Sequence, residues 1–203
     1  MRPVVADWIA RLIVCLMFGA LCVNILQEFQ RTGHITGLML LASEFLVIIL
    51  TLARRKAKLI DHSVPAAIVT IVSAAGPPLL RADSDFIALA PDMVTGFISF
   101  LALLLILSGK LTLGRSFGLV PANRGVVVQG PYSAVRHPIY SGYLIAHVSF
   151  IAAHPSTWNV TVFAIADGAL IIRALMEERV LSQDARYQAY CNRVAWHLIP
   201  GVF

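Results

Sequence analysis

The sequence predicts an all-α integral membrane protein with about six transmembrane helices, and two observations support this. Of its 203 residues, 58% are hydrophobic and 13% are charged. About a quarter of the residues in soluble domains are charged, so these few charges could not cover a soluble core of this size, and lipid must cover it instead. In addition, apolar runs close to the roughly 20 residues needed to cross a bilayer recur along the chain.

The first apolar run, residues 8–26, resembles a signal peptide because Arg2 and Arg11 precede most of its apolar residues. The run is long enough to span a membrane and no small-residue cleavage pattern follows it, so we expect a retained first helix. The last two runs are separated only by "HPST", which predicts a tight helical hairpin with Pro155 and Ser156 at its turn. The five runs that follow the first are residues 35–52, 64–80, 93–107, 138–153 and 158–175.

The distribution of Lys and Arg predicts the orientation. With six spans, fourteen of the sixteen basic residues fall on one side together with both termini, and Arg31 and Arg81 are the exceptions. By the positive-inside rule this side is cytoplasmic, so the sequence predicts a multi-pass protein with both termini in the cytoplasm. The same rule accounts for the net charge of +5 without nucleic acid, and no aromatic-basic RNA motif is present.

We expect a single membrane domain over residues 1–203. Residues 1–109 supply four spans, and residues 110–203 supply a linker, the last two spans and a C-terminal tail. The unusual chemistry gathers in this second part, at the cytoplasmic ends of the last two spans. Cys15, Cys22 and Cys191 show no metal or redox spacing, so we interpret them as packing residues and predict no metal site.

The first chemical cluster is the stretch "VRHPIYSGY" at the start of span 138–153. Pro138 suits a first helical turn and biases His137 toward an extended backbone, which places Arg136 and His137 at the helix mouth. Free amides, the helix dipole and Arg136 together favour a carboxylate or phosphate, and Tyr140 adds a ring and a hydroxyl one turn later. The alternative is structural: Arg136 anchors the helix, His137 caps it and the tyrosines belong to the interfacial aromatic belt.

The second cluster lies at the end of the last span. Arg173 and Glu177 are four residues apart and share a helix face, with Glu178 on the neighbouring flank. Two carboxylates at a helix C-terminus are poor partners for the dipole, so a cationic ligand would relieve them. A ligand whose ammonium or sulfonium group is held by Glu177, and whose carboxylate meets Arg136 or the helix start, would use both clusters. Methionine-type zwitterions fit this description. The alternative is a surface ion pair worth less than ~1 kcal/mol.

The order of these motifs resembles a known family. The run from "GRSFG" through "GPYSAVRHPIYSGYL" and "RALMEERVL" to "IPG", residues 113–201, resembles the C-terminal half of the isoprenylcysteine carboxyl methyltransferase family, which is similar to membrane phospholipid methyltransferases. The resemblance implies S-adenosylmethionine bound between the last two spans, the linker and the tail. It also implies that Glu177 binds the cofactor and that Arg173 is the catalytic residue on the acceptor side. The pocket lining that it implies is Val126, Val127, Tyr132, His137, Pro138, Ile139 and Tyr140.

The reaction implied by the resemblance is methyl transfer to an amphiphilic, lipid-like acceptor at the membrane interface. The carboxylate of a prenylcysteine-like compound is the favoured acceptor, and a phospholipid amine is the second class. Because the sulfonium methyl is already activated, the protein's contribution is alignment and desolvation. A carboxylate acceptor could be oriented by Arg173, whereas an amine or thiol needs a proton acceptor, for which Glu178, Asp167 and His197 are candidates.

Two other functions stay open. A membrane reductase of the sterol type would bind NADPH, whose phosphates call for more polar groups than Arg115, Arg124 and Arg136 supply. A non-catalytic lipid-binding protein is the other alternative, but lipid binding alone does not explain why polar clusters occur at the ends of two spans. Glu44 and Asp167 are costly in hydrocarbon, so they are either functional or hydrogen-bonded between helices.

Overall fold

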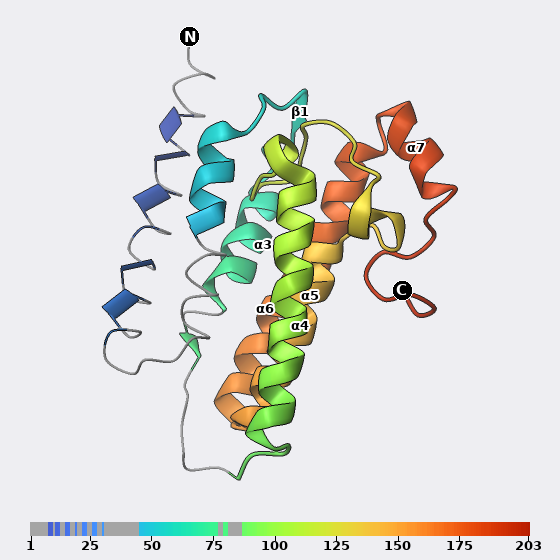
Figure 1. The fold of residues 1–203 in the computed structure, drawn as a ribbon. Coiled ribbons are helices and arrows are strands. Elements are labelled where there is room, and N and C mark those ends of the chain that lie inside the picture. The colour runs from blue at the N-terminus through green and yellow to red at the C-terminus, as the bar shows by residue number, and fades with distance from the viewer. Residues whose placement is uncertain are drawn as a thin grey trace.

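The computed structural model describes residues 45–76, 79–80 and 87–203 without interruption. The described residues are mostly helical, and Figure 1 shows the longer helices gathered in one bundle. Glu44, Arg31 and Arg81 lie outside the described residues, as do parts of the predicted spans 8–26, 35–52 and 64–80. Within 8–30, the structure describes residues 8, 9, 11, 12, 15, 16, 19, 22, 23, 26, 27 and 30, which are helical.

The apolar runs of the sequence predict the ends of some helices better than those of others. The predicted span 138–153 matches helix α5 (Pro138–Ala153) at both ends. The predicted span 64–80 begins with α3 (Val64–Ala75), but that helix ends at Ala75 because Gly76 and two prolines follow in the sequence. Helices α4 (Asp92–Leu113) and α6 (Thr157–Leu181) continue six residues past the predicted ends, since their polar last turns remain helical.

Two of the described helices are long and apolar enough to cross a membrane, Asp92–Ser116 and Thr157–Leu181, each of 25 residues. Helices α3 and α5 are apolar but shorter, with 12 and 16 residues. Large apolar side chains stay exposed on these helices, among them Phe97 on α4 and Ile165 on α6, 62% and 60% exposed. An exposed apolar surface of this kind marks contact with lipid or another protein.

Small residues allow the helices to approach closely. A Cβ atom on Gly142 of α5 would lie 2.6 Å from Ile106 Cγ1 and 3.0 Å from the Ala102 carbonyl oxygen, both on α4. In the same way, a Cβ atom on Gly76 at the end of α3 would lie 2.5 Å from the Cβ of Ala166 on α6. Such contacts are typical of membrane helices, whose association depends on close packing. They pair α4 with α5 and α3 with α6, and α5 also contacts α6.

Short elements close one end of the bundle. The linker runs through a 3-10 turn, η2 (Gly114–Ser116), then β2 (Ala122–Asn123) and a second turn, η3 (Gly130–Ser133), before α5 begins. Strand β2 pairs antiparallel with β1 (Leu59–Ile60), so the loop before α3 is tied to the linker. After α6 the chain makes one turn and forms α7 (Ala185–Cys191), which lies at the same end of the molecule as β1 (Figure 1).

Candidate functional site

The candidate site lies where the linker, the end of α6 and the C-terminal segment (residues 192–203) meet. Backbone hydrogen bonds fix the C-terminal segment beside the start of α5. The amide of Arg136 donates to the carbonyl oxygen of Trp196, and the amide of His137 donates to that of His197, both at 2.9 Å. Side chains from the start of α5 and from the C-terminal segment therefore meet the last turns of α6.

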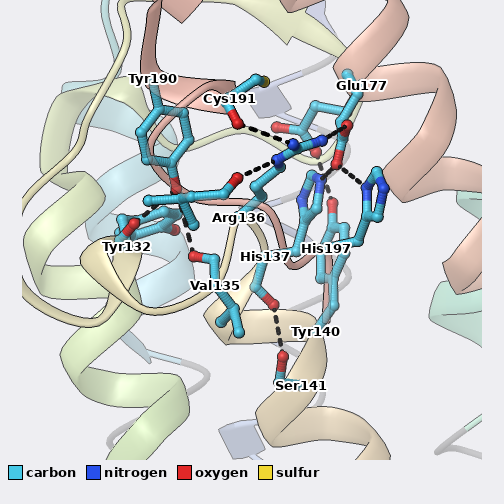
Figure 2. A network of polar contacts seen from close by, with 12 residues as sticks. Tyr132, Val135, Arg136, His137, Tyr140, Ser141, Glu177, Tyr190, Cys191 and His197 are labelled. Carbon is cyan, nitrogen blue, oxygen red and sulfur yellow. Dashed lines mark hydrogen bonds and ion pairs between the residues drawn. The ribbon is translucent and has the colours of Figure 1, made fainter. Parts of the chain in front are cut away.

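The Glu178 carboxylate is the centre of a polar network with Arg136, His137 and His197. Figure 2 labels these three partners. Its Oε2 accepts a hydrogen bond from Arg136 Nη1 at 2.9 Å, and its Oε1 lies 3.0 Å from His137 Nε2 and 2.6 Å from His197 Nδ1. Because a carboxylate only accepts hydrogen bonds, both histidine nitrogens that face it carry a proton. Only 12% of the Glu178 and Arg136 side chains is exposed, so this is a largely buried charge network.

This network differs from the expectation drawn from the sequence. There, the carboxylate of a ligand met Arg136 or the start of the helix, and the alternative was a surface ion pair between Arg173 and Glu177. In the structure Arg136 donates from all three nitrogens to protein atoms, since Nε reaches the Val194 carbonyl oxygen at 2.8 Å and Nη2 that of Cys191 at 3.3 Å. The Arg136 guanidinium thus pairs with Glu178 and also holds the C-terminal segment in place.

Glu177 has a different environment from its neighbour. Its Oε2 accepts a hydrogen bond from the hydroxyl of Tyr140 at 2.9 Å, and its side chain is half-buried. The Tyr140 ring is buried and stacks on His137, with ring centroids 5.3 Å apart and planes 3° from parallel. A partly accessible carboxylate beside an aromatic ring is an environment that suits an organic cation.

Arg173 lies next to this pair. Its guanidinium carbon is 5.3 Å from the centre of the Tyr140 ring, and Nη1 is 3.5 Å from the hydroxyl oxygen of Ser73 on α3. The residue is 6% exposed, and its Nε is buried without a hydrogen-bond partner among the described residues. Arg173 is therefore a buried cation for which the described residues supply no carboxylate, as in a site that receives an anionic or oxygen ligand.

The remaining residues predicted for the cofactor pocket are divided between two places. Pro138 and Ile139 are buried at the start of α5, where Ile139 packs in the helix core. Tyr132 is buried and its carbonyl oxygen accepts a hydrogen bond from the hydroxyl of Tyr190 on α7 at 2.6 Å; burial raises the pKa of the Tyr132 phenol well above its usual range. Val126 packs against the cluster of Tyr187, Tyr190 and Val194, and Val127 is half-buried nearby in the linker.

Hence the structure brings together Arg136, His137, Tyr140, Arg173 and Glu177, and it links Tyr132 to them through α7. The sequence considered His197 only as a candidate proton acceptor and did not single out Tyr190. The signal for His197 is its position in "WHLIPG", within the motif that closes the family resemblance. Tyr190 lies four residues before Val194, in the segment that returns to the start of α5, and this position is the sequence feature that could have indicated it.

Asp167, the candidate within the last span, pairs with a residue of the preceding helix. Its Oδ1 lies 2.6 Å from Nδ1 of His147 on α5, and the His147 ring stacks on Phe163 with centroids 4.0 Å apart. This pair joins α5 to α6 about ten residues from Glu177, roughly 15 Å along the helix. This contact is a hydrogen bond between helices, which is the structural alternative that the sequence offered for Asp167.

A cavity of about 480 Å³ lies on another side of α5. Its walls come from α4, α5, the linker turn and the C-terminal segment, and none of the candidate site residues lines it. The candidate site and this apolar cavity are therefore separate. The lining residues are Ile98, Leu105, Pro131, Ala134, Val135, Ser141, Leu144, Ile145, Val148, Leu198, Ile199 and Pro200.

Comparison with known proteins adds no family to these observations: no protein-family model matches the chain, and no curated protein matches it. Within the described part of the chain, no group of three or more His, Cys, Asp or Glu side chains is placed to hold a metal ion. At the Glu178 network, the Arg136 guanidinium supplies the positive charge next to the carboxylate. The geometry of the site is thus the basis for a functional proposal.

Proposed function

We propose that the chain is an integral membrane methyltransferase that uses S-adenosylmethionine and acts on an amphiphilic, lipid-like acceptor. The observation that supports this best is the arrangement around Tyr140. Its hydroxyl donates to the half-buried Glu177, and its ring lies 5.3 Å from the buried Arg173 guanidinium, whose Nε has no hydrogen-bond partner in the described part of the chain. An anionic group and a cationic group therefore stand within reach of one aromatic ring, as a zwitterionic donor and an oxygen acceptor require.

Each of these side chains has a role in the proposal. S-adenosylmethionine supplies a methyl group on a sulfonium, which is already activated for displacement. Glu177 attracts the positively charged part of this molecule, and the stacked rings of Tyr140 and His137 form an apolar wall beside it. Arg173 holds an oxygen of the acceptor, of which the carboxylate of a prenylcysteine-like compound fits best because a guanidinium binds carboxylates in a planar fork. Alignment and exclusion of water then supply the rate enhancement.

The proposal includes a multi-pass membrane placement with about six spans and cytoplasmic termini. Its support is the exposed apolar surface of α4 and α6 together with the position of the basic residues. Exposed Arg55 and Arg115 come from separate loops at one end of the bundle, where the amide of Arg55 donates to the carbonyl oxygen of Arg115 at 2.7 Å. Lys56 and Lys58 extend this basic end. Positive charge at one end of apolar helices is typical of the cytoplasmic side.

Ligand-dependent thermal stabilisation of the purified protein tests the function. S-adenosylhomocysteine at about 100 times its dissociation constant is expected to add about 2.7 kcal/mol to the stability of the folded state. NADPH at the same concentration is the control, and we expect no stabilisation from it. Stabilisation by NADPH alone would replace this proposal with a reductase, and no stabilisation by either would favour a non-catalytic lipid-binding protein.

Glu177→Gln is expected to weaken binding of S-adenosylhomocysteine at least about tenfold while leaving the melting temperature of the free protein nearly unchanged. The reason is that glutamine keeps an oxygen for the Tyr140 hydroxyl but loses the charge that attracts the ligand. Titration of the thermal shift with ligand measures both quantities in one experiment. Wild-type affinity in this variant would show that Glu177 does not hold the ligand.

Labelling of an introduced cysteine tests the orientation. Ser182 is exposed just after α6, at the end of the bundle that carries the basic loops. In a chain whose three native cysteines are replaced by alanine, Ser182→Cys is expected to react with a membrane-impermeant maleimide only after the cells are permeabilised. Reaction in sealed cells would reverse the topology.

A further inference from the structure

The C-terminal loop (residues 196–203) has a defined shape and an unusual surface. The amides of Leu198 and Ile199 both donate to the carbonyl oxygen of Phe203 at 2.8 Å, and the Phe203 amide donates back to Ile199 at 3.0 Å. Gly201 adopts a φ of 82°, which favours glycine and closes the turn. The loop is therefore a compact hairpin-like structure held by its own backbone hydrogen bonds.

Most of the large side chains of this loop are apolar and exposed. Val202 is 75% exposed, Ile199 47%, and Trp196 and Phe203 40% each. His197 is the only titratable side chain in the loop, and it turns inward to Glu178 while its ring stacks on Phe203 with centroids 4.7 Å apart. An exposed surface that combines Trp and Phe with aliphatic residues, and whose exposed side chains carry no charge, is typical of a segment in the membrane interface.

The position of the loop indicates which part of the membrane it would meet. Leu198 is buried, and its carbonyl oxygen accepts a hydrogen bond at 2.6 Å from Ser141 in the first turn of α5. Ile199 and Pro200 also line the apolar cavity whose other walls include Leu105 of α4 and Ile145 of α5. The apolar surface of the loop thus continues the exposed apolar face of α4 and α5 at the level where α5 begins.

We propose that the C-terminal loop inserts its exposed apolar side chains into the interfacial layer of the bilayer, and that this contact holds His197 against Glu178. The proposal rests on the membrane placement of the helices proposed above. The partner is the lipid surface itself, because the exposed side chains of the loop are apolar and continuous with helix faces that would contact lipid. The bilayer would then stabilise one wall of the candidate site, since the same loop supplies His197 and the backbone partners of Arg136 and His137.

Fluorescence of Trp196 tests the proposal directly, because the chain contains only three tryptophans. With Trp8→Phe and Trp158→Phe, the sole remaining indole is in the loop. In phosphatidylcholine vesicles, we expect its emission to fall about twofold when the lipid carries bromine near the headgroup end of its acyl chains, and acrylamide in the water to quench it weakly. Strong quenching by acrylamide without an effect of bromine would overturn the proposal.

A matched control separates this proposal from the membrane placement of the helices. Leu104 is 44% exposed on α4, so Leu104→Trp in a chain with all three native tryptophans changed to Phe reports on that helix alone. Bromine quenching at position 104 but not at Trp196 would refute the loop insertion and keep the membrane placement. Absence of quenching at both positions would refute both, and a Trp196 shielded from acrylamide as well as from bromine would show that protein, such as a second copy, covers the loop.

A charge in the loop provides a second test. Val202→Asp places a carboxylate at a position of the loop where the valine is 75% exposed. If the loop lies in the interface, this change is expected to raise acrylamide quenching of Trp196 several-fold in vesicles. Ser182→Asp, at an exposed polar position after α6, should leave the quenching unchanged. Equal quenching in the Val202→Asp variant and the parent chain would contradict the insertion.

Discussion

Glu178→Gln is expected to lower the melting temperature by about 6–12 °C, which corresponds to about 3 kcal/mol or more of the free energy of unfolding. The glutamate is a largely buried anion with three partners, the Arg136 guanidinium and the imidazoles of His137 and His197. Glutamine leaves the guanidinium without its counter-ion in a largely buried site. The side-chain NH2 group of glutamine is a donor, and it would face nitrogens of Arg136 or of the histidines that are themselves donors. At least one hydrogen bond is therefore lost.

The neighbouring substitution Glu177→Gln is the matched control, because it makes the same chemical change one residue away. There only the hydroxyl of Tyr140 loses a charged acceptor, and we expect a loss of about 1 kcal/mol or less. Differential scanning fluorimetry of both variants in one detergent compares them directly. Equal and small losses would mean that Glu178 is not the centre of a buried network, and a Glu178→Gln variant that is stable but no longer binds ligand would make it a ligand group instead.

The sequence predicts the helices best where local signals mark their ends. Pro138 at the start of α5 and Ser156 before α6 act through their own backbone neighbours, since proline fits a first turn and the Ser156 hydroxyl accepts the Asn159 amide at 3.1 Å. The apolar spans predicted for α4 and α6 end six residues before the helices do, because apolarity falls there while helical hydrogen bonding continues. Lys110 and Glu178 are polar, yet both lie within the last turns of their helices.

The sequence singled out several residues that the structure brings close together, but it did not indicate which of them pair. The spacing of the motifs indicates that the start of α5 and the end of α6 meet, and the structure places Arg136 and Tyr140 next to Glu178 and Glu177 respectively. Adjacent residues on a helix point about 100° apart, so the rotation of α6 against α5 decides which glutamate meets Arg136. That rotation depends on packing between distant residues and on the return of His197, which no local pattern of the sequence encodes.

The same limit applies to Asp167. The sequence marks it as costly within an apolar span, and the structure supplies His147, twenty residues earlier, as its hydrogen-bond partner at 2.6 Å. A single apolar span offers no information on which polar residue of the neighbouring helix lies at the same depth. Only the close approach of α5 and α6 brings the two side chains together.

Arg173→Met is expected to leave the melting temperature unchanged or to raise the stability of the ligand-free protein by about 1 kcal/mol, while it abolishes methyl transfer. Arg173 is 6% exposed, its Nε has no hydrogen-bond partner among the described residues, and its contact to the Ser73 hydroxyl is long at 3.5 Å. A buried cation with so little compensation costs stability, and methionine replaces its volume without that cost. Residues that reduce stability in this way are expected at functional sites.

Arg173→Lys separates a role in catalysis from a role of positive charge alone. Lysine keeps the charge beside Tyr140 but loses the planar fork that orients a carboxylate, so turnover should fall about 100-fold while binding of S-adenosylhomocysteine stays close to that of the parent protein. Single-turnover methyl transfer and the ligand-induced thermal shift measure the two properties independently. Wild-type turnover in the lysine variant would limit Arg173 to a charge effect, and loss of ligand binding would move it from the acceptor to the cofactor. A loss of stability in Arg173→Met as large as that in Glu178→Gln would instead make Arg173 a structural residue. Removing a guanidinium lowers the stability of the folded protein only when the guanidinium makes stabilising contacts there.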